Sequence, residues 1–260
     1  MGEGMNSKEV GYEKKDNVAI ITINSPENMN ALSKTVREAL LSALDRAEQD
    51  MEVRVVILTG TGKVFIAGAD LKDLPKKGDI QGTRDFLRTS IHMFRRFETL
   101  SKPIIAAVNG LALGGGFEVT LYCDIVTASE KAKFSFPEAG LGIIAAFGLL
   151  RLHQTVGRHK AKELLMTADM IDAEEARRLN LVNQVVPHDE LIDKTMELAQ
   201  KIVKNAPLSV EGIKTALNRE LGGMDVNYLM DAIPIFFSTN DIGEGVGAFM
   251  EKRRPKFTGS

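Results

Sequence analysis

The chain has 260 residues, with 33 lysine and arginine residues against 35 aspartate and glutamate residues. This length allows one large domain, or one domain with an appendage, around a substantial core. A formal charge of −2 excludes a global field that recruits nucleic acid or an anionic membrane, so we expect neither as a partner. A single cysteine, Cys123, excludes an intrachain disulfide, and the composition does not support a redox or metal-binding function.

The N-terminal residues 1–17 are polar and mixed in charge, without the apolar or arginine-rich pattern of a targeting sequence. No later segment holds the roughly 18 uncharged apolar residues of a membrane span. We therefore expect a cytoplasmic protein.

The first predicted elements are a strand, a helix and a second strand. Residues 18–23 and 53–59 are short β-branched runs, and residues 33–50 between them place apolar side chains at helical spacing. Ser33 is suited to be the N-cap of this helix. Because a helix connects the two strands, we expect the strands to pair in parallel.

A second unit of the same kind follows. Residues 83–100 predict a helix and residues 104–108 a buried strand, while residues 124–128 and 133–136 add short strands. After about residue 158 the β-branched runs nearly vanish and helical patterns dominate. These patterns cover residues 160–167, 173–181, 190–205, 207–221 and 227–252, with one late strand candidate at residues 183–186. The sequence thus predicts an α/β core followed by a helical C-terminal region.

The segment after the strand 104–108 is the first that points to chemistry, because small residues lead into Gly114, Gly115 and Gly116. Three consecutive glycines cost backbone entropy, so the fold must require them. Two explanations fit equally well. Either the backbone enters a helix with free N–H groups directed at a ligand oxygen, or the chain makes a tight turn packed closely against a neighbour.

Two glutamates are candidate acid–base groups. Glu118 falls in the first turn of a helix predicted over residues 117–123, where the helix dipole favours a carboxylate. Glu138 follows Pro137 at the end of a short apolar strand. Taken alone, the first is explained as a helix-start residue and the second as a solvated loop carboxylate.

Residues 65–71 are apolar and small at a place where a surface loop would be polar. Small side chains permit a ligand to approach the backbone closely. We interpret Asp70, near the end of this segment, as the cap of a following turn.

Together these segments resemble the enoyl-CoA hydratase/isomerase (crotonase) family. The resemblance rests on four ordered motifs, IAGADL, AAVNGLALGGGFE, CDIVTASEKAKFSFPEAGLG and AFMEKRRPKF, and extends from about residue 18 to residue 257. It implies a spiral of ββα units with a helical trimerisation region, assembled as a homotrimer or a dimer of trimers. We expect residues 1–200 to form the core with the active site. Residues 201–260 are expected to serve oligomerisation and to complete the CoA pocket.

The resemblance also implies catalytic roles. The amides of Ala69 and Gly115 correspond to the oxyanion hole for the thioester oxygen, and Glu118 and Glu138 to the two acid–base glutamates of the hydratases. Hydration needs a base that deprotonates the water attacking Cβ and an acid that protonates Cα, and two carboxyl groups can share these tasks. We therefore expect an enoyl-CoA hydratase that forms a 3-hydroxyacyl-CoA and needs no cofactor beyond the CoA of its substrate.

Further positions are assigned to substrate binding by the same resemblance. They are Ala67, Gly68, Asp70, Leu71 and Gly114, together with Phe249 and Lys252 of the C-terminal segment near the nucleotide.

Residues 145–150 depart from the family pattern. After Gly142 the hydratases usually read something like I-P-G-x-G-G-T-Q-R, whereas this chain reads I-I-A-A-F-G-L-L-R. Phe147, Leu149 and Leu150 predict a more apolar and bulkier wall for the acyl pocket. This leaves open a hydratase for a particular acyl group, a double-bond isomerase, and a hydratase of an unusual dienoyl-CoA.

Some crotonase-like proteins also bind RNA, and a basic stripe on the predicted helix 33–50 would indicate this function. Lys34, Arg37 and Arg46 lie on this helix, but acidic residues of the same helix balance them, so no basic stripe forms. We expect no nucleic acid as a partner.

Overall fold

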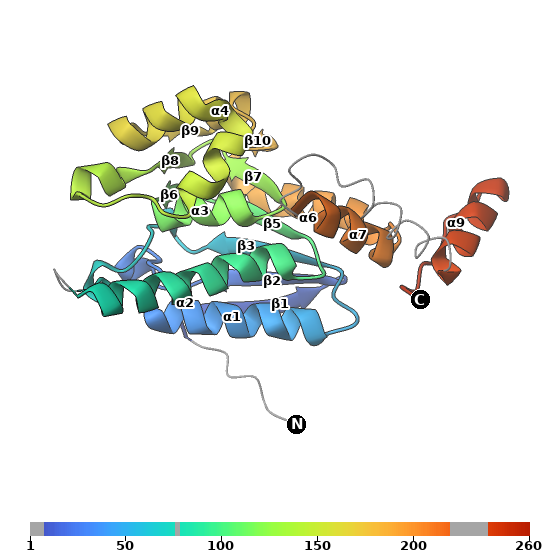
Figure 1. Ribbon diagram of the computed structural model, residues 1–260. Helices are drawn as coiled ribbons and strands as arrows, with labels where there is room; N and C mark the ends of the chain where they lie inside the picture. The colour runs from blue at the N-terminus through green and yellow to red at the C-terminus, as the bar shows by residue number, and fades with distance from the viewer. Residues whose placement is uncertain (1–7, 76–78, 219–238) are drawn as a thin grey trace.

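The computed structural model describes residues 8–75, 79–218 and 239–260. Two sheets and the helices around them form the body of the molecule, and the last helix stands apart at one end (Figure 1). The predicted helix over residues 227–252 lies partly outside the described residues. Among the residues that are described, no helix is long and apolar enough to cross a bilayer.

The larger sheet has the strand order β1-β2-β3-β5-β7-β10. β1 runs antiparallel to β2, and every other neighbouring pair is parallel, which confirms the pairing predicted for the first two core strands, β2 and β3. The strands are β1 Val10–Lys15, β2 Val18–Ile23, β3 Val55–Gly60, β5 Ile104–Val108, β7 Ile125–Ser129 and β10 Gln184–Val186.

The smaller sheet has the order β4-β6-β8-β9. β3, β5 and β7 of the larger sheet are each followed in the chain by one strand of the smaller sheet and then by a helix. This repetition is the ββα pattern that the resemblance implied. The strands are β4 Val64–Ile66, β6 Leu111–Leu113, β8 Lys133–Ser135 and β9 Ile171–Asp172.

The helices cover both faces of the larger sheet (Figure 1). Their bounds are α1 Lys34–Gln49, α2 Ile80–Thr99, α3 Gly115–Tyr122, α4 Gly148–Thr167, α5 Ala173–Arg178, α6 Leu191–Val203, α7 Pro207–Asn218 and α9 Asn240–Met250. Within the described residues, short 3-10 turns join them to the strands, namely η1 Pro26–Asn28, η2 Leu71–Asp73, η3 Pro137–Leu141 and η4 His188–Glu190. Ser33 caps α1 as predicted, since its side chain accepts a hydrogen bond from Val36 N.

The hydrophobic core lies on both sides of the larger sheet. In β5, Ile104, Ala106 and Val108 belong to the large cluster on one side, while Ile105 and Ala107 pack on the other side, which α6 covers. Strands covered on both faces carry continuous apolar runs rather than alternating ones. The run of five apolar residues in the sequence therefore reflects the sheet's position between two layers of helices.

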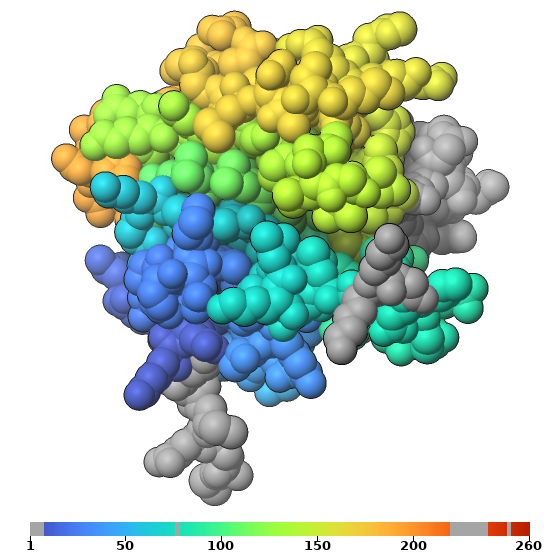
Figure 2. All heavy atoms as spheres, turned by 90° about the vertical axis from the view of Figure 1, so that its left-hand side faces the viewer, coloured from blue at the N-terminus to red at the C-terminus, as the bar shows by residue number. Residues whose placement is uncertain are grey.

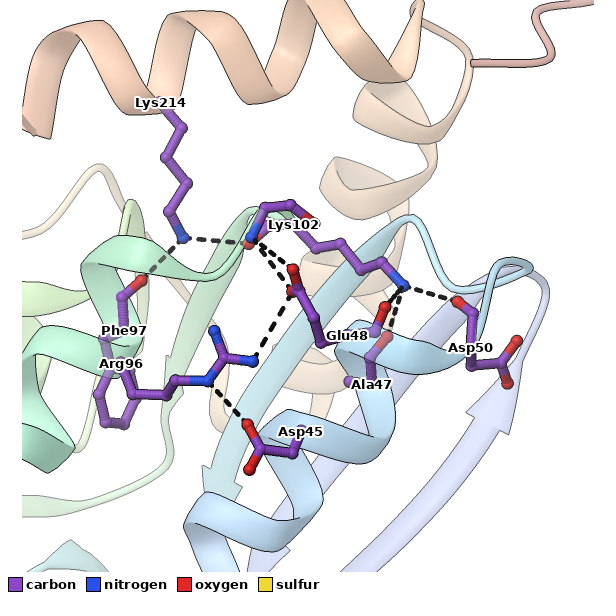
Figure 3. A network of polar contacts seen from close by, with 9 residues as sticks. Asp45, Ala47, Glu48, Asp50, Arg96, Phe97, Lys102 and Lys214 are labelled. Atoms are coloured by element: carbon purple, nitrogen blue, oxygen red, sulfur yellow. Dashed lines mark hydrogen bonds and ion pairs between the residues drawn. The ribbon is translucent and has the colours of Figure 1, made fainter. Parts of the chain in front are cut away.

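Lys214 joins the helical C-terminal region to the core (Figure 3). Its Nζ donates to the carbonyl oxygens of Phe97 and Lys102 at 2.8 and 3.0 Å and forms an ion pair with Asp124 at 2.8 Å. Phe97 lies in the last turn of α2, where backbone carbonyls lack helical partners and a cation is favoured. The three donors of one buried ammonium thus fix α7 against α2 and the strand β5 that follows it.

Candidate active site

A pocket of about 590 Å³, open to solvent, lies beside the N-terminal end of α3. In Figure 2 the yellow-green atoms of the segment around η3 lie directly above the teal atoms of α2. The lining is mainly apolar, and among the described residues that line it only Arg37, Glu118 and Glu138 are charged.

Two glycine segments from separate ββα units meet at one side of this pocket. Gly68 has a φ of +95°, and a Cβ on it would lie 3.1 Å from Gly115 N. A Cβ on Gly115 would lie 3.5 Å from Ala69 N. The two backbones therefore lie in van der Waals contact, and a side chain at Gly68 would crowd the second segment. A Cβ on Gly116 would lie only 1.9 Å from Ile66 O. The structure thus confirms one of the two explanations for the glycines, a tight turn packed closely against a neighbouring segment. The same packing brings the amide of Ala69 close to that of Gly115, and these two amides are predicted to form the oxyanion hole.

Gly115 is the first residue of α3, so its N–H has no acceptor within the helix. The preceding residue, Gly114, adopts a φ of +50° that most side chains avoid. This turn starts the helix two residues before the predicted position at residue 117.

Glu118 is almost completely buried, with 5% of its surface exposed. Its Oε1 accepts hydrogen bonds from the backbone amides of Phe147 and Gly148 at 2.9 and 2.7 Å. The pKa of Glu118 is raised to about 7, mainly by burial; the two amides oppose this shift and the nearby Glu138 adds to it. A carboxyl with a pKa near neutrality is suited to proton transfer at physiological pH.

Glu138 lies in η3 and lines the same pocket. Its Oε2 is buried and has no hydrogen-bond partner among the described residues. Burial raises the pKa of this carboxyl as well, and only its own backbone amide opposes the shift. The structure thus lines one pocket with two carboxyl groups that are 20 residues apart in the sequence. Glu118 lies in the first turn of α3 as predicted, and Glu138 is not the solvated loop carboxylate that its position suggests in isolation.

The loop that departs from the family pattern has a second role that the sequence did not reveal. Phe147 lines the pocket as predicted, and its ring lies 4.5 Å from that of Phe94. Leu149 and Leu150 follow in the first turn of α4, are 45% and 48% exposed, and are not among the described residues that line the pocket. Their part in the wall of the acyl pocket stays a prediction. The amides of Phe147 and Gly148, which bind Glu118, were missed, and the single retained glycine was their only signal.

The other predicted substrate-binding residues have less direct roles in this structure. Asp70 caps η2 through a hydrogen bond from Lys72 N, as predicted, and Leu71 is 64% exposed. Ala67 N donates to Met29 O and holds the segment in place. Phe249 and Lys252 lie in and after α9, which stands apart from α3 in Figure 1 and contributes no described residue to the pocket lining, so their contact with substrate remains a prediction. Arg37, which lines the pocket, was considered only as a possible surface cation.

Comparisons with known proteins agree with this geometry. The sequence is 44% identical over 256 residues to the short-chain-enoyl-CoA hydratase of Clostridium acetobutylicum, covering 96% of this chain and 97% of that protein. It is 41% identical to the crotonyl-CoA hydratase of Syntrophomonas wolfei, covering 94% and 96%. The crystal structure of an enoyl-CoA hydratase from Bacillus anthracis superposes with a TM-score of 0.89 at 36% identity, over 97% of this chain and 100% of that one.

The sequence profile of the enoyl-CoA hydratase/isomerase family matches residues 13–260. This match includes every strand of the two sheets except the first residues of β1, and it includes the glycine segments and both glutamates of the pocket. The chain belongs to the enoyl-CoA hydratase/isomerase family.

Proposed function

We propose that this enzyme adds water across the double bond of a 2-enoyl-CoA to give a 3-hydroxyacyl-CoA, using the pocket that contains Glu118 and Glu138. The relatives named above carry hydratase activity in their names, which confirms the enzyme class predicted from the sequence. The observation that carries the proposed mechanism is the convergence of two backbone amides, the buried Glu118 and the partly buried Glu138 on one pocket.

The amides of Ala69 and Gly115 bind the thioester oxygen in this proposal. Attack of water at Cβ pushes negative charge onto that oxygen, and preorganised N–H donors stabilise the charge without reorganisation. Loss of one such donor typically costs about 3 kcal/mol of transition-state stabilisation. The apolar lining strengthens the interaction because it keeps bulk water away.

Glu118 acts as the base in this proposal and Glu138 as the acid. Amide N–H groups donate to carboxylate lone pairs and therefore favour the ionised form of Glu118, leaving its second oxygen to accept a proton from water. Glu138 is supported by no amide but its own and holds a buried oxygen without a partner, which favours its protonated form. This division supplies the proton for Cα and removes the proton from water.

The test is hydration of crotonyl-CoA, followed by the loss of absorbance of the conjugated thioester. Glu118→Gln and Glu138→Gln should each lower kcat by about 100- to 10,000-fold, the usual contribution of a positioned acid or base. Glu130→Gln is the matched control, because Glu130 is exposed and lies outside the pocket. Full activity in both pocket variants would rule out the mechanism.

Labelled water separates hydration from the alternative reactions. A hydratase transfers oxygen-18 from water into its product, whereas a double-bond isomerase incorporates none. A product without oxygen-18 would show that the enzyme is an isomerase and not a hydratase. A panel of enoyl-CoA substrates with saturated, branched and dienoyl acyl chains would identify the preferred acyl group.

The C-terminal residues 201–260 are proposed to assemble the enzyme into a homotrimer or a dimer of trimers. Phe249 and Lys252 are then proposed to complete a CoA pocket within that assembly, since α9 stands apart from α3 (Figure 1) and none of its described residues lines the pocket of its own chain. Light scattering on the purified protein measures the assembly, and Lys252→Ala should raise KM for the CoA thioester with little change in kcat.

A further inference from the structure

Arg37 is a charged residue in a position where charge is costly. It projects from the first turn of α1, is only 7% exposed, and lines the pocket beside Ala69. A buried guanidinium destabilises the fold unless its N–H groups are bonded and its charge is balanced. The partners of Arg37 therefore indicate its role.

The first partner is the backbone of Leu32. Arg37 Nη1 donates to Leu32 O at 2.6 Å. Leu32 N in turn donates to Gly68 O at 2.7 Å, and Leu32 pairs with Ala69 in an isolated parallel bridge. Arg37 therefore fixes the carbonyl group of Leu32, and the N–H group of Leu32 fixes the carbonyl group of Gly68, the residue before Ala69.

The bond to Gly68 O determines where the amide of Ala69 points. The carbonyl of Gly68 and the N–H of Ala69 belong to one planar peptide unit and point in opposite directions when the unit is trans. Leu32 fixes one end of this unit, and the N–H at the other end is the donor assigned to the thioester oxygen. Rotation of the unit by a few tens of degrees would move that donor away from the oxygen.

The second partner of Arg37 is Asp73, on the other side of Ala69 in the chain. Arg37 Nη2 lies 3.7 Å from Asp73 Oδ2, and the same oxygen accepts a hydrogen bond from Lys34 N at 2.6 Å. Asp73 ends η2, the turn that begins directly after Asp70. Arg37 and Asp73 therefore tie the start of α1 to the chain both before and after the oxyanion amide.

We propose that Arg37 is a positioning residue that orients the Ala69 amide toward the thioester oxygen, acting through Leu32 and Asp73. This inference rests on the proposed function of that amide. General stability is a poor explanation for the residue, because Arg37 Nε is buried without a hydrogen-bond partner among the described residues. A methionine of similar length would fill the space without the cost of burying a charge.

The test compares Arg37→Met with Arg46→Met. Arg46 lies on the same helix but is exposed and rests on the ring of Tyr12, away from the pocket. Arg37→Met should lower kcat for crotonyl-CoA about 10- to 100-fold, the scale expected for a misaligned catalytic donor, while KM changes less than about twofold. Arg46→Met should retain the kcat and KM of the unaltered enzyme.

A spectroscopic readout reports on the oxyanion hole directly. The absorbance of cinnamoyl-CoA moves to longer wavelength when its carbonyl oxygen accepts strong hydrogen bonds, since these stabilise the charge-separated excited state. The bound ligand should show this red shift in the unaltered enzyme and in Arg46→Met, and a smaller shift in Arg37→Met. An unchanged red shift in Arg37→Met would overturn the inference, and so would a rise in KM without a fall in kcat.

Asp73→Asn gives a second route if Arg37→Met does not fold. The amide oxygen of the substituted side chain would still accept the bond from Lys34 N, but the charge that faces Arg37 would be lost. Both kcat and the red shift should therefore fall, by less than in Arg37→Met, and unchanged values in this variant would also overturn the inference.

The outcomes separate this inference from the proposed function. Hydration and a red shift in the unaltered enzyme, with no effect of either variant, would remove the role of Arg37 and leave the proposed function intact. Absence of both signals in the unaltered enzyme would remove the two proposals together.

Discussion

A Cβ atom on Gly114 would lie 2.6 Å from Oε1 of Glu138. The glycine that starts α3 and the carboxyl group proposed as the acid are therefore packed against each other, with no room for a methyl group between them. Gly114 also has a φ of +50°, which strains any other L-residue. The contact with Glu138 and the positive φ therefore both require glycine at position 114, next to the place where the two glycine segments meet.

Gly114→Ala should displace Glu138 and lower kcat at least about tenfold, because small misplacements of a catalytic group are costly. The matched control is Gly140→Ala in η3, where an added Cβ meets nothing within 4 Å. Steady-state kinetics with crotonyl-CoA measure both. Equal kcat values in the two variants would show that the contact with Glu138 is unimportant.

The raised pKa of Glu118, about 7, predicts the pH dependence of hydration. A base must be ionised to accept a proton from water, so kcat/KM should fall about tenfold per unit as the pH decreases below 7. The profile is measured in the free enzyme between pH 5 and pH 8, with circular dichroism to confirm that the fold persists. An acidic limb near pH 4.5, the ordinary value for glutamate, would contradict the burial argument.

The same shift predicts how Glu118 affects stability. Its pKa is about 7 in the folded state against an ordinary value of 4.5 for glutamate, so the folded state retains the proton more strongly than the unfolded state. The contribution to stability is complete below pH 4.5 and is lost as the pH rises through about 7. Glu118→Gln has no such proton, so the unaltered enzyme should lose about 3 kcal/mol relative to the variant between pH 4 and pH 8. Urea unfolding at both pH values measures the difference, and parallel curves would refute it.

Lys214 provides a prediction about the helical C-terminal region. Lys214→Met should lower the free energy of unfolding by about 3 kcal/mol, because it leaves Asp124 buried without its counter-charge and removes donors from two carbonyls. Lys201→Met, on an exposed position of α6, is the control. Adding Asp124→Asn to Lys214→Met should recover part of the loss, and a double variant as unstable as the sum of the single ones would show that the ion pair does not couple them.

Local elements were predictable where the signal lies within one segment. The strands β2 and β5 have the predicted bounds, because consecutive β-branched and apolar residues fill a strand covered on both faces. The prediction for β3 began two residues early, since Val53 N bonds back to Asp50 O in the turn after α1. Hydrophobic pattern identifies a buried segment but does not show where the backbone leaves its turn.

The site divides in the same way. By itself the sequence determined the family, the glycine segments and the pair Glu118 and Glu138, because these residues recur in motifs with a fixed order. Only the tertiary structure decided that the amides of Phe147 and Gly148 hold Glu118, and that Arg37 reaches Ala69 through Leu32. These contacts use backbone N–H and C=O groups, which every residue except proline carries in the same form, so the pattern of side chains in the sequence cannot predict them. Their positions are determined when the ββα units pack against one another.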